Sequence, residues 1–351
     1  GMIAFLGLFL LISKASTMEE QVFFWSYGVL IGGVMQTVVN LPLLRKIGYQ
    51  IKLNISLQGE ALAAVWQRLI PGAVGIAVRQ INLIVDTILA SLLATGSIAA
   101  LGYGNRLMQL PMGIFGVAAG VAVLPLFSRF VAEKDWNGFR ESLRFSTISL
   151  SFIMLPITAI IAGLGKDIIR LFFMRGAFDI KSVNMTYSAL LCYSLGILFY
   201  SLNRLIIPAF YANKDTKTPV KVSILIVFIN VILNLILMQV LQLAGLALAT
   251  SLSAAVQFFI LRDLMNKRIG FIKFPNVIKP MLKLLSLSLL VYLGLFFANH
   301  FLIPANIWQL LSKIILLTVA SFVFMAVGSS LLKVKYSKEI KQRIMTKFLS
   351  K

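Results

Sequence analysis

Long apolar stretches alternate with short charged segments along almost the whole chain. Stretches of about 20 apolar residues are long enough to cross a bilayer as an α-helix. A membrane β-barrel would instead show alternating segments of about ten residues, and this pattern is not seen. The stretches predict ten spans, at residues 2–13, 22–44, 62–93, 97–128, 146–165, 186–211, 222–241, 243–261, 284–303 and 308–332. The predicted fold class is therefore an all-α polytopic membrane protein.

The lengths of the spans and their prolines predict departures from straight helices. The first stretch is too short to span alone, and the third and fourth exceed 30 residues, so we expect these two to tilt, kink or protrude. Pro111, Pro156 and Pro208 lie inside the fourth, fifth and sixth spans. Because proline has no backbone N–H and its ring crowds the preceding turn, we expect a kink at each.

Composition supports the membrane class and narrows the chemistry. Apolar residues make up 59% of the chain and charged residues 13%, and the mean hydropathy is +0.91, so the chain cannot supply the polar shell of a soluble domain. It has one cysteine, Cys192, and one histidine, His300. These numbers exclude an intrachain disulfide and a cysteine metal cluster, and they argue against histidine-based catalysis. We therefore expect a protein that is not an enzyme.

The basic residues give an orientation. The chain has 33 lysines and arginines against 12 acidic residues, a formal net charge of +21. Most of the basic residues fall in loops on one side of the predicted spans, which places that side and the C-terminus in the cytoplasm. Nucleic-acid binding would need a basic cluster on a folded surface, so no nucleic-acid partner is expected.

Two further basic segments point to membrane lipids as partners. The predicted outward loop Gly165–Val183 mixes basic and apolar residues, which is typical of an amphipathic interfacial segment. It serves either as an anchor at a helix end or as a contact with lipid headgroups. The basic tail after Leu332 is interpreted as an anchor to the lipid surface.

Asp86 is the one acidic residue that the spans place deep in an apolar segment. Arg79 and Asn82 lie on the same helix face, seven and four residues before it. Arg106 follows the next turn at a similar depth. One interpretation is structural, with an Asp86–Arg79 or Asp86–Arg106 ion pair that holds helices together. The other is functional, because a charge at membrane depth usually faces a cavity or a partner.

A polar stripe precedes Pro111 on the fourth span. Asn105 and Gln109 are one turn apart, and Arg106 is three residues before Gln109. A guanidinium held there can bind phosphate through two parallel hydrogen bonds. Arg204, beside Asn203 in the sixth span, is a second candidate, and Arg79 a third. Deep arginines predict either structural ion pairs or a water-filled cavity for an anion, and we favour the cavity.

Asn230 and Asn234 are spaced i,i+4 on the seventh span, so they face the same way. Thr250 on the next span lies at a similar depth. Asparagine pairs often hold membrane helices together by hydrogen bonds. With the carboxylate of Asp86 and the backbone carbonyl of Leu246, the same groups could instead bind a small hard cation such as sodium. Both interpretations stay open at this stage.

Several segments resemble the MurJ/MviN family of lipid II flippases. They are Arg-Leu-Ile-Pro-Gly at 68–72, Asp-Thr-Ile-Leu-Ala-Ser-Leu-Leu at 86–93, Asn-Arg-Leu-Met-Gln-Leu-Pro at 105–111, Gly-Val-Ala-Ala-Gly-Val-Ala-Val-Leu-Pro at 116–125 and Pro-Ala-Phe-Tyr-Ala-Asn-Lys-Asp-Thr-Lys-Thr-Pro at 208–219. The resemblance implies two six-helix lobes around a central cavity and two extra C-terminal helices. Since the family has 14 spans, it also implies that about four are missing at the start and that this chain is a shortened piece.

The resemblance also implies a division of the chain. Residues 1–45 would hold the last two helices of the N-terminal lobe, and residues 46–265 the six-helix C-terminal lobe. Residues 266–351 would hold the two extra helices and the basic tail.

The resemblance finally implies a function and a set of sites. Arg106 matches a cavity arginine of the family, Arg204 a basic position of the corresponding span, and Asp86, Asn230, Asn234 and Thr250 a proposed cation site. Some relatives have acids where this chain has Asn105 and Gln109. The expected function is flipping of lipid II, or of another polyprenyl-diphosphate-linked sugar, by alternating access, with no cofactor except a candidate sodium ion. Alternatives are a related exporter of drugs or of another lipid-linked glycan, a non-transporting scaffold, and a membrane glycosyltransferase, which the scarcity of acids disfavours.

Overall fold

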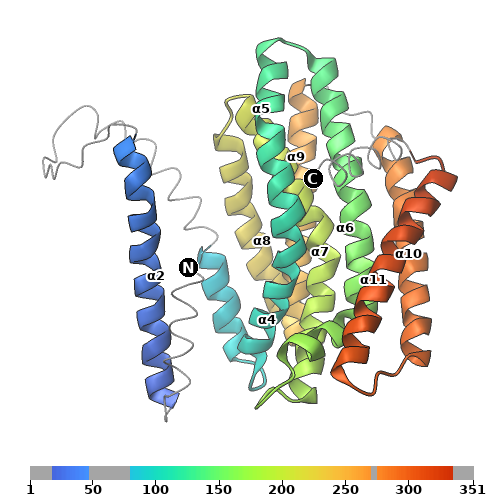
Figure 1. The fold of residues 1–351 in the computed structure, drawn as a ribbon. Helices are drawn as coiled ribbons and strands as arrows, with labels where there is room; N and C mark the ends of the chain where they lie inside the picture. The colour runs from blue at the N-terminus through green and yellow to red at the C-terminus, as the bar shows by residue number, and fades with distance from the viewer. Residues whose placement is uncertain (1–17, 47–79, 270–274, 335–351) are drawn as a thin grey trace, which may run out of the picture. The chain divides into compact units, whose positions relative to one another are not determined.

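The computed structural model describes residues 18–46, 80–269 and 275–334, and every regular element in these ranges is helical (Figure 1). The elements are α2 (Met18–Lys46), a helix at Gln80–Ser91, α4 (Ser97–Pro111), the π-helical η1 (Met112–Val117), α5 (Ala118–Ala132), α6 (Trp136–Phe173), α7 (Ile180–Ala212), α8 (Lys217–Leu241), α9 (Leu243–Ile269), α10 (Pro275–Phe301) and α11 (Ile307–Leu331). The chain divides into two compact units, Gly1–Arg68 and Leu69–Lys351. The first contains α2 and the second contains all the other helices.

Seven helical segments of the described part of the chain are long and apolar enough to cross a membrane. They are Ser97–Ala132, Trp136–Phe173, Ile180–Ala212, Lys217–Leu241, Leu243–Lys267, Val277–Phe301 and Ile307–Leu331, and they coincide with the fourth to tenth predicted spans. Helix α2 coincides with the second, and Gln80–Ser91 is the described part of the third. The first predicted span lies outside the described residues. The all-α polytopic class is confirmed.

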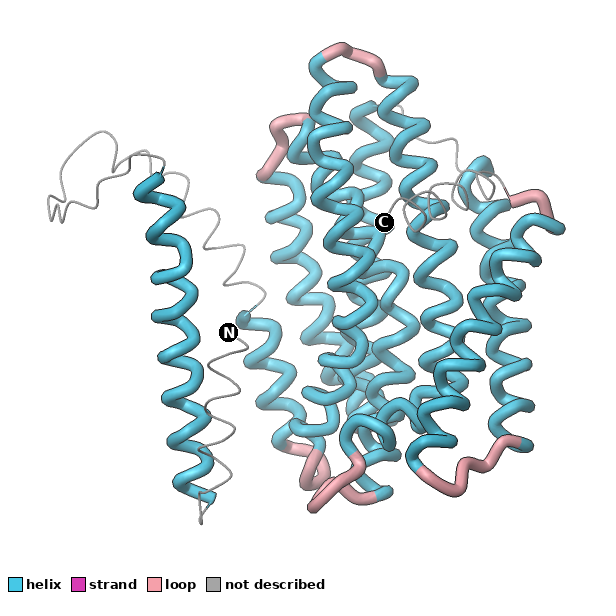
Figure 2. Tube along the Cα trace, in the orientation of Figure 1, coloured by secondary structure: helices cyan, strands magenta, loops and turns pink. Residues whose placement is uncertain are grey.

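Loops of the second unit gather at two opposite ends of its helices (Figure 2). This arrangement follows from helices of similar length joined by short turns. The connection between α6 and α7 is Met174–Asp179, and that between α7 and α8 is Asn213–Thr216. These two loops lie at opposite ends of α7, as the predicted topology requires.

The three prolines differ in what they do to the backbone. Pro111 is followed directly by the π-helical turn Met112–Val117, a local widening that accommodates the missing N–H and the bulky ring. Helices α6 and α7, in contrast, continue through Pro156 and Pro208 without a break in their helical backbone.

Helix α6 is much longer than the predicted span 146–165, and the expectation of an outward loop beginning at Gly165 is wrong. The helix begins after Asp135, whose carboxylate accepts a hydrogen bond from the Gly138 N–H at 2.8 Å, and it continues to Phe173. The charged residues after Gly165 do not end it because Asp167 is buried in an ion pair with Lys313 of α11, at 2.8 Å.

The start of α7 is fixed by a similar cap. Asp179 accepts hydrogen bonds from the backbone N–H and the hydroxyl of Ser182, both at 2.8 Å. These bonds favour the charged carboxylate and hold the pKa of Asp179 below its usual range. The ionised side chain also complements the positive end of the helix dipole. The residue at which α7 begins is thus determined by local hydrogen bonds of Asp179.

Helix α7 is the centre of the second unit and packs against α4, α5, α6 and α9. Close approach depends on small residues, as is usual where helices meet inside a membrane. A Cβ at Gly196 of α7 would lie 2.8 Å from the Cα of Ser251 on α9. Helices α10 and α11 attach to α6, where the Asn299 amide donates to the Gly163 carbonyl at 2.8 Å.

Many large apolar side chains point away from this core. Phe228 and Ile232 of α8, Leu289 of α10 and Val319 of α11 are each more than half exposed. In water such a surface would be a severe aggregation hazard, whereas in a bilayer it is the surface that meets the lipid.

Candidate functional site

Asp86 is held by amides from two helices. Its carboxylate accepts a hydrogen bond from the Asn234 side chain of α8 at 2.6 Å and a longer one from Asn82 at 3.3 Å. Among the ion pairs of the described residues, none includes Asp86. The expected alternative of an Asp86–Arg106 pair is therefore not formed. Arg79, the other expected partner, lies outside the described residues.

The asparagine pair extends this contact into the interface between α8 and α9. Asn234 donates a second hydrogen bond, to the side-chain oxygen of Asn230 at 2.9 Å, and Asn230 donates to the hydroxyl of Ser253 at 3.2 Å. Asn230 and Asn234 are 2% and 0% exposed. Ser253 was not among the residues singled out from the sequence.

Two side-chain oxygens beside Asp86 are left without a donor. The Oδ1 atoms of Asn82 and Asn234 are buried and accept no hydrogen bond from the described residues. An unsatisfied buried acceptor costs roughly 1–3 kcal/mol. Amide oxygens next to a carboxylate form a set of hard ligands, the kind that a small cation binds.

Thr250 and Leu246 complete the predicted cation set, and the structure joins them to each other. The Thr250 hydroxyl donates to the Leu246 carbonyl one turn earlier on α9, at 2.9 Å. Direct hydrogen bonds therefore link three members of the set, Asp86, Asn230 and Asn234, and separately link the other two. The described residues contain no group of three histidine, cysteine or acidic side chains suited to a transition metal.

Arg106 lies on an exposed face of α4. Its guanidinium lies over the Tyr103 ring, 5.6 Å from the centroid. On the same helix the Gln109 amide donates to the Asn105 oxygen at 2.6 Å, so the predicted polar stripe exists as one continuous surface. Stacking on an aromatic ring fixes a guanidinium while leaving its N–H groups available in the ring plane.

Two glycines of the neighbouring helical segment leave the space that Arg204 occupies. A Cβ at Gly120 of α5 would lie 2.6 Å from the Arg204 carbonyl oxygen, and one at Gly116 would lie 3.4 Å from its Cδ. The η1 and α5 segments therefore meet α7 in a notch, formed by Gly116 of η1 and Gly120 of α5, that receives Arg204. The neighbouring Asn203 bonds elsewhere, donating to the Ala254 carbonyl of α9 at 2.9 Å.

The buried Asp167–Lys313 pair is a polar site that sequence reasoning missed. Their side chains are 9% and 7% exposed. The apolar pattern of the sequence predicts outer loops or span ends for both residues and predicts Asp86 as the only deep carboxylate. The available signal was an acid, Asp167, between the basic residues Lys166 and Arg170 at the end of an apolar stretch.

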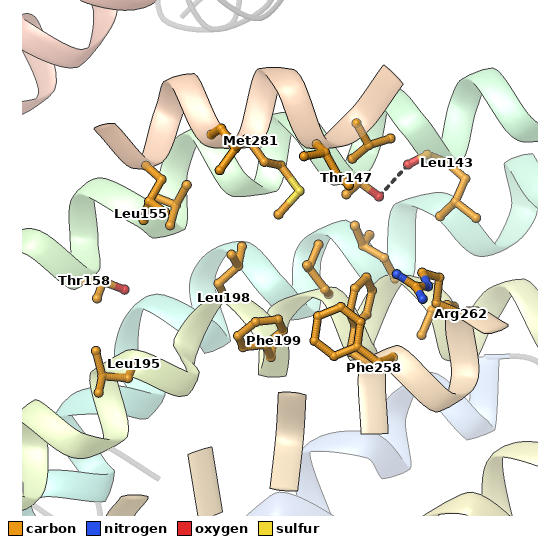
Figure 3. A pocket seen from close by; sticks show the side chains of 18 residues that line it. Leu143, Thr147, Leu155, Thr158, Leu195, Leu198, Phe199, Phe258, Arg262 and Met281 are labelled. Atoms are coloured by element: carbon orange, nitrogen blue, oxygen red, sulfur yellow. Dashed lines mark hydrogen bonds between the residues drawn. The ribbon is translucent and has the colours of Figure 1, made fainter. Parts of the chain in front are cut away.

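An apolar pocket of about 440 Å³ opens between α6, α7, α9 and α10 (Figure 3). Leucine, phenylalanine and methionine side chains such as Leu198, Phe258 and Met281 line most of it. Arg262 stands among the lining residues, bonded to Asp263 and stacked 5.2 Å from the Phe259 ring centroid. The sequence did not predict this pocket, whose lining suits a hydrocarbon chain.

The fold defines a class, the multi-pass helical membrane proteins. The structure is similar to an outward-facing multidrug resistance MATE family transporter of the MOP superfamily, with a TM-score of 0.51, 18% identity and coverage of 80% of this chain and 66% of the other. At that identity the likeness shows the fold alone.

The chain belongs to the lipid II flippase MurJ family, whose model matches residues 1–317. A solved lipid II flippase MurJ in an inward closed conformation is similar with a TM-score of 0.72 and 26% identity, over 94% of this chain and 66% of that one. This membership confirms the resemblance, and the family is one of transporters, not enzymes.

Curated relatives of the chain carry the name of the same family. A probable lipid II flippase MurJ of Vibrio cholerae is 34% identical over 234 residues, 67% of this chain and 45% of its own length. One of Helicobacter pylori is 32% identical over 289 residues, 78% of this chain and 62% of its own length. The chain thus spans about half the length of the curated relatives it matches.

Proposed function

We propose that this chain contains the C-terminal lobe of a flippase that moves lipid II across the bacterial inner membrane by alternating access. Family membership supports the substrate class. The observation that carries the proposal is Arg106, a guanidinium stacked on Tyr103 in the middle of a span and flanked by the amides of Asn105 and Gln109.

The chemistry of the headgroup explains why such a site is needed. Lipid II carries a diphosphate between its sugars and its polyprenyl chain, and a guanidinium binds phosphate oxygens through two parallel hydrogen bonds. Arg106 and Arg204, with Asn105, Gln109 and Arg79, would bind the diphosphate while the polyprenyl tail stays in lipid. Rocking of the lobes would then expose the headgroup on the other side.

We further propose that a sodium ion couples to this movement at Asp86. The carboxylate, the side-chain oxygens of Asn230 and Asn234, the Thr250 hydroxyl and the Leu246 carbonyl would be its ligands. The donorless oxygen of Asn234 beside the carboxylate supports this set. From the basic-residue asymmetry, the C-terminus would lie in the cytoplasm.

Arg106 is tested in cells whose own lipid II flippase is depleted and replaced by a full-length protein carrying this sequence. We expect Arg106→Ala to abolish growth and lipid II flipping, and Arg106→Lys to restore them only in part, because lysine lacks the planar two-pronged donor set. The matched control is Arg129→Ala, which removes an exposed arginine at the far end of α5, where it pairs with Glu133.

Normal complementation by Arg106→Ala, with protein levels equal to wild type, would remove Arg106 from the mechanism. Purified protein that binds another lipid-linked glycan or a cationic drug in preference to lipid II would replace the proposed substrate.

A further inference from the structure

A line of polar side chains continues from Asp86 along the interface of α8 and α9. On α8, Ser223 lies seven residues before Asn230, and so on the same face as Asn230 and Asn234. On α9, the Gln257 amide donates to the Ser223 hydroxyl at 3.2 Å, one turn beyond Ser253. Two polar stripes therefore face each other along the two helices.

Helix α7 adds a third side chain to this line. The Asn203 amide donates to the Gln257 oxygen at 3.3 Å as well as to the Ala254 carbonyl at 2.9 Å. We call the six residues Ser223, Gln257, Asn203, Ser253, Asn230 and Asn234 the polar seam.

Two side-chain oxygens of the polar seam, which lie at different depths, have no hydrogen-bond donor in the described part of the chain. The Oδ1 atoms of Asn203 and Asn234 are buried without a donor among the described residues, and the two side chains belong to residues only 6% and 0% exposed. Side chains that serve only to join helices would be satisfied by each other, since each orphaned acceptor is costly. Oxygens left open instead suit a water molecule or a passing cation.

The polar seam has the length and position of a route to the cytoplasm. Ser223 and Asn234 are eleven residues apart, which is about 16 Å along a helix, or about half the hydrocarbon thickness. The Ser223 end lies within two turns of Lys221 and Arg262, at the end of the helices that carries the basic residues.

We propose that the polar seam is the route by which a small monovalent cation passes between the cytoplasmic ends of α8 and α9 and Asp86. The inference rests on the proposed cation site at Asp86 and adds its path of access. Amide and hydroxyl oxygens spaced about one helical turn apart replace the water shell of the ion step by step, as polar linings do in ion pathways.

The polar seam is tested by the reaction of buried thiols with silver ion, a hydrated monovalent cation. In a Cys192→Ser background of the purified chain in lipid nanodiscs, Ser253→Cys places a thiol on the seam. Ser251→Cys is the matched control, because Ser251 is equally buried on the same helix but donates to the Cys192 carbonyl of α7. We expect the Ser253→Cys thiol to react at least about tenfold faster, since access governs thiol reactivity. Equal rates would overturn the route.

A blocking variant then shows whether access runs through the seam. Gln257→Leu keeps the side-chain size but removes the polar bridge to Ser223 and Asn203, and should slow the Ser253→Cys reaction about tenfold. Thr147→Val, which removes a buried hydroxyl that is hydrogen-bonded within α6 and lies outside the polar seam and the cation set, should not slow it. An unchanged rate with Gln257→Leu would also overturn the route.

Failure of the route is distinguishable from failure of the cation site. If sodium still stabilises the wild-type chain more than potassium does, but the thiols react alike, the site stands and the route falls. If the sodium effect is absent, the site itself fails.

Discussion

Asp86 is the residue on which the proposed coupling depends, and the groups around it only partly compensate the charge of its carboxylate. Two amides donate to its carboxylate, yet no ion pair of the described residues neutralises it. Hydrogen bonds from neutral amides offset only part of the cost of removing a carboxylate from water. A bound cation would neutralise the carboxylate of Asp86. It would also be coordinated by the side-chain oxygen of Asn234, which accepts no hydrogen bond from the described residues.

Sodium should therefore raise the melting temperature of the chain more than potassium does, because a ligand that binds only the folded state stabilises it by mass action. At a concentration about 100 times the dissociation constant the gain is about 2.7 kcal/mol. Asp86→Asn should erase the difference between the two ions. Thermal unfolding in detergent at constant ionic strength measures it.

Asp167→Asn is the control for that measurement. It removes the buried carboxylate of Asp167, which already has Lys313 as its counter-ion. It should lower the melting temperature while leaving the sodium–potassium difference in place. A difference that survives Asp86→Asn, or is missing from the wild type, would contradict the cation site.

Some of this residue-scale detail was predictable. The i,i+4 spacing of Asn230 and Asn234 and the rarity of deep acids predicted a cluster with Asp86. Ser253 and Gln257 could not be predicted, because the face that α9 turns towards α8 depends on how α9 packs against α7. Serine and glutamine are also common in spans without any shared role, so their presence alone carries little information.

At the scale of elements, glycines decide how closely α5 and α7 meet. The atom nearest to a Cβ at Gly120 is a backbone carbonyl oxygen, which cannot move aside as a flexible side chain could. The notch at Gly116 and Gly120 thereby allows the backbone of α5 to approach α7 closely at Arg204.

Gly120→Ala should accordingly destabilise the protein by about 1–3 kcal/mol, the usual cost of overpacking a well-packed interior. Gly113→Ala is the matched control, since nothing lies within 4 Å of its Cβ position. It should be neutral or slightly stabilising, because alanine favours helix over glycine. The denaturation midpoints of the two variants measure this difference in stability. Equal midpoints would contradict the close approach of α5 to α7 at Gly120.

The sequence predicted helix identity better than helix ends. Hydropathy ended the fifth span at Gly165, where Lys166 and Asp167 interrupt the apolar run, yet α6 continues to Phe173. A charged residue ends a membrane-spanning helix only if its side chain would face lipid. Asp167 faces Lys313 on a helix far away in sequence, which no local window can detect.

At the scale of the whole molecule, alternating loops at two ends of the second unit define the topology. The distribution of lysines and arginines then assigns a side to each end. This part of the fold was largely predictable, since it follows from composition summed over many residues and not from any single contact.

In a Cys192→Ser background, Ala177→Cys and Thr216→Cys place thiols in the loops before and after α7, at exposed positions. We expect a membrane-impermeant reagent added outside intact cells to label Ala177→Cys and to leave Thr216→Cys unlabelled until the membrane is opened. Each variant is the control for the other. Labelling of both from one side would refute the arrangement of spans.

The buried pair between Asp167 and Lys313 bears on the order of biosynthesis. Helix α6 is translated and enters the membrane well before α11, so the carboxylate reaches the bilayer while its partner Lys313 is not yet made. Until then Asp167 must stay hydrated at the membrane edge or carry a proton, because an uncompensated charge in lipid is expensive. We therefore expect the last turns of α6 to reach their final depth only when α11 docks. Helix α11 would thus complete the insertion of a helix made long before it.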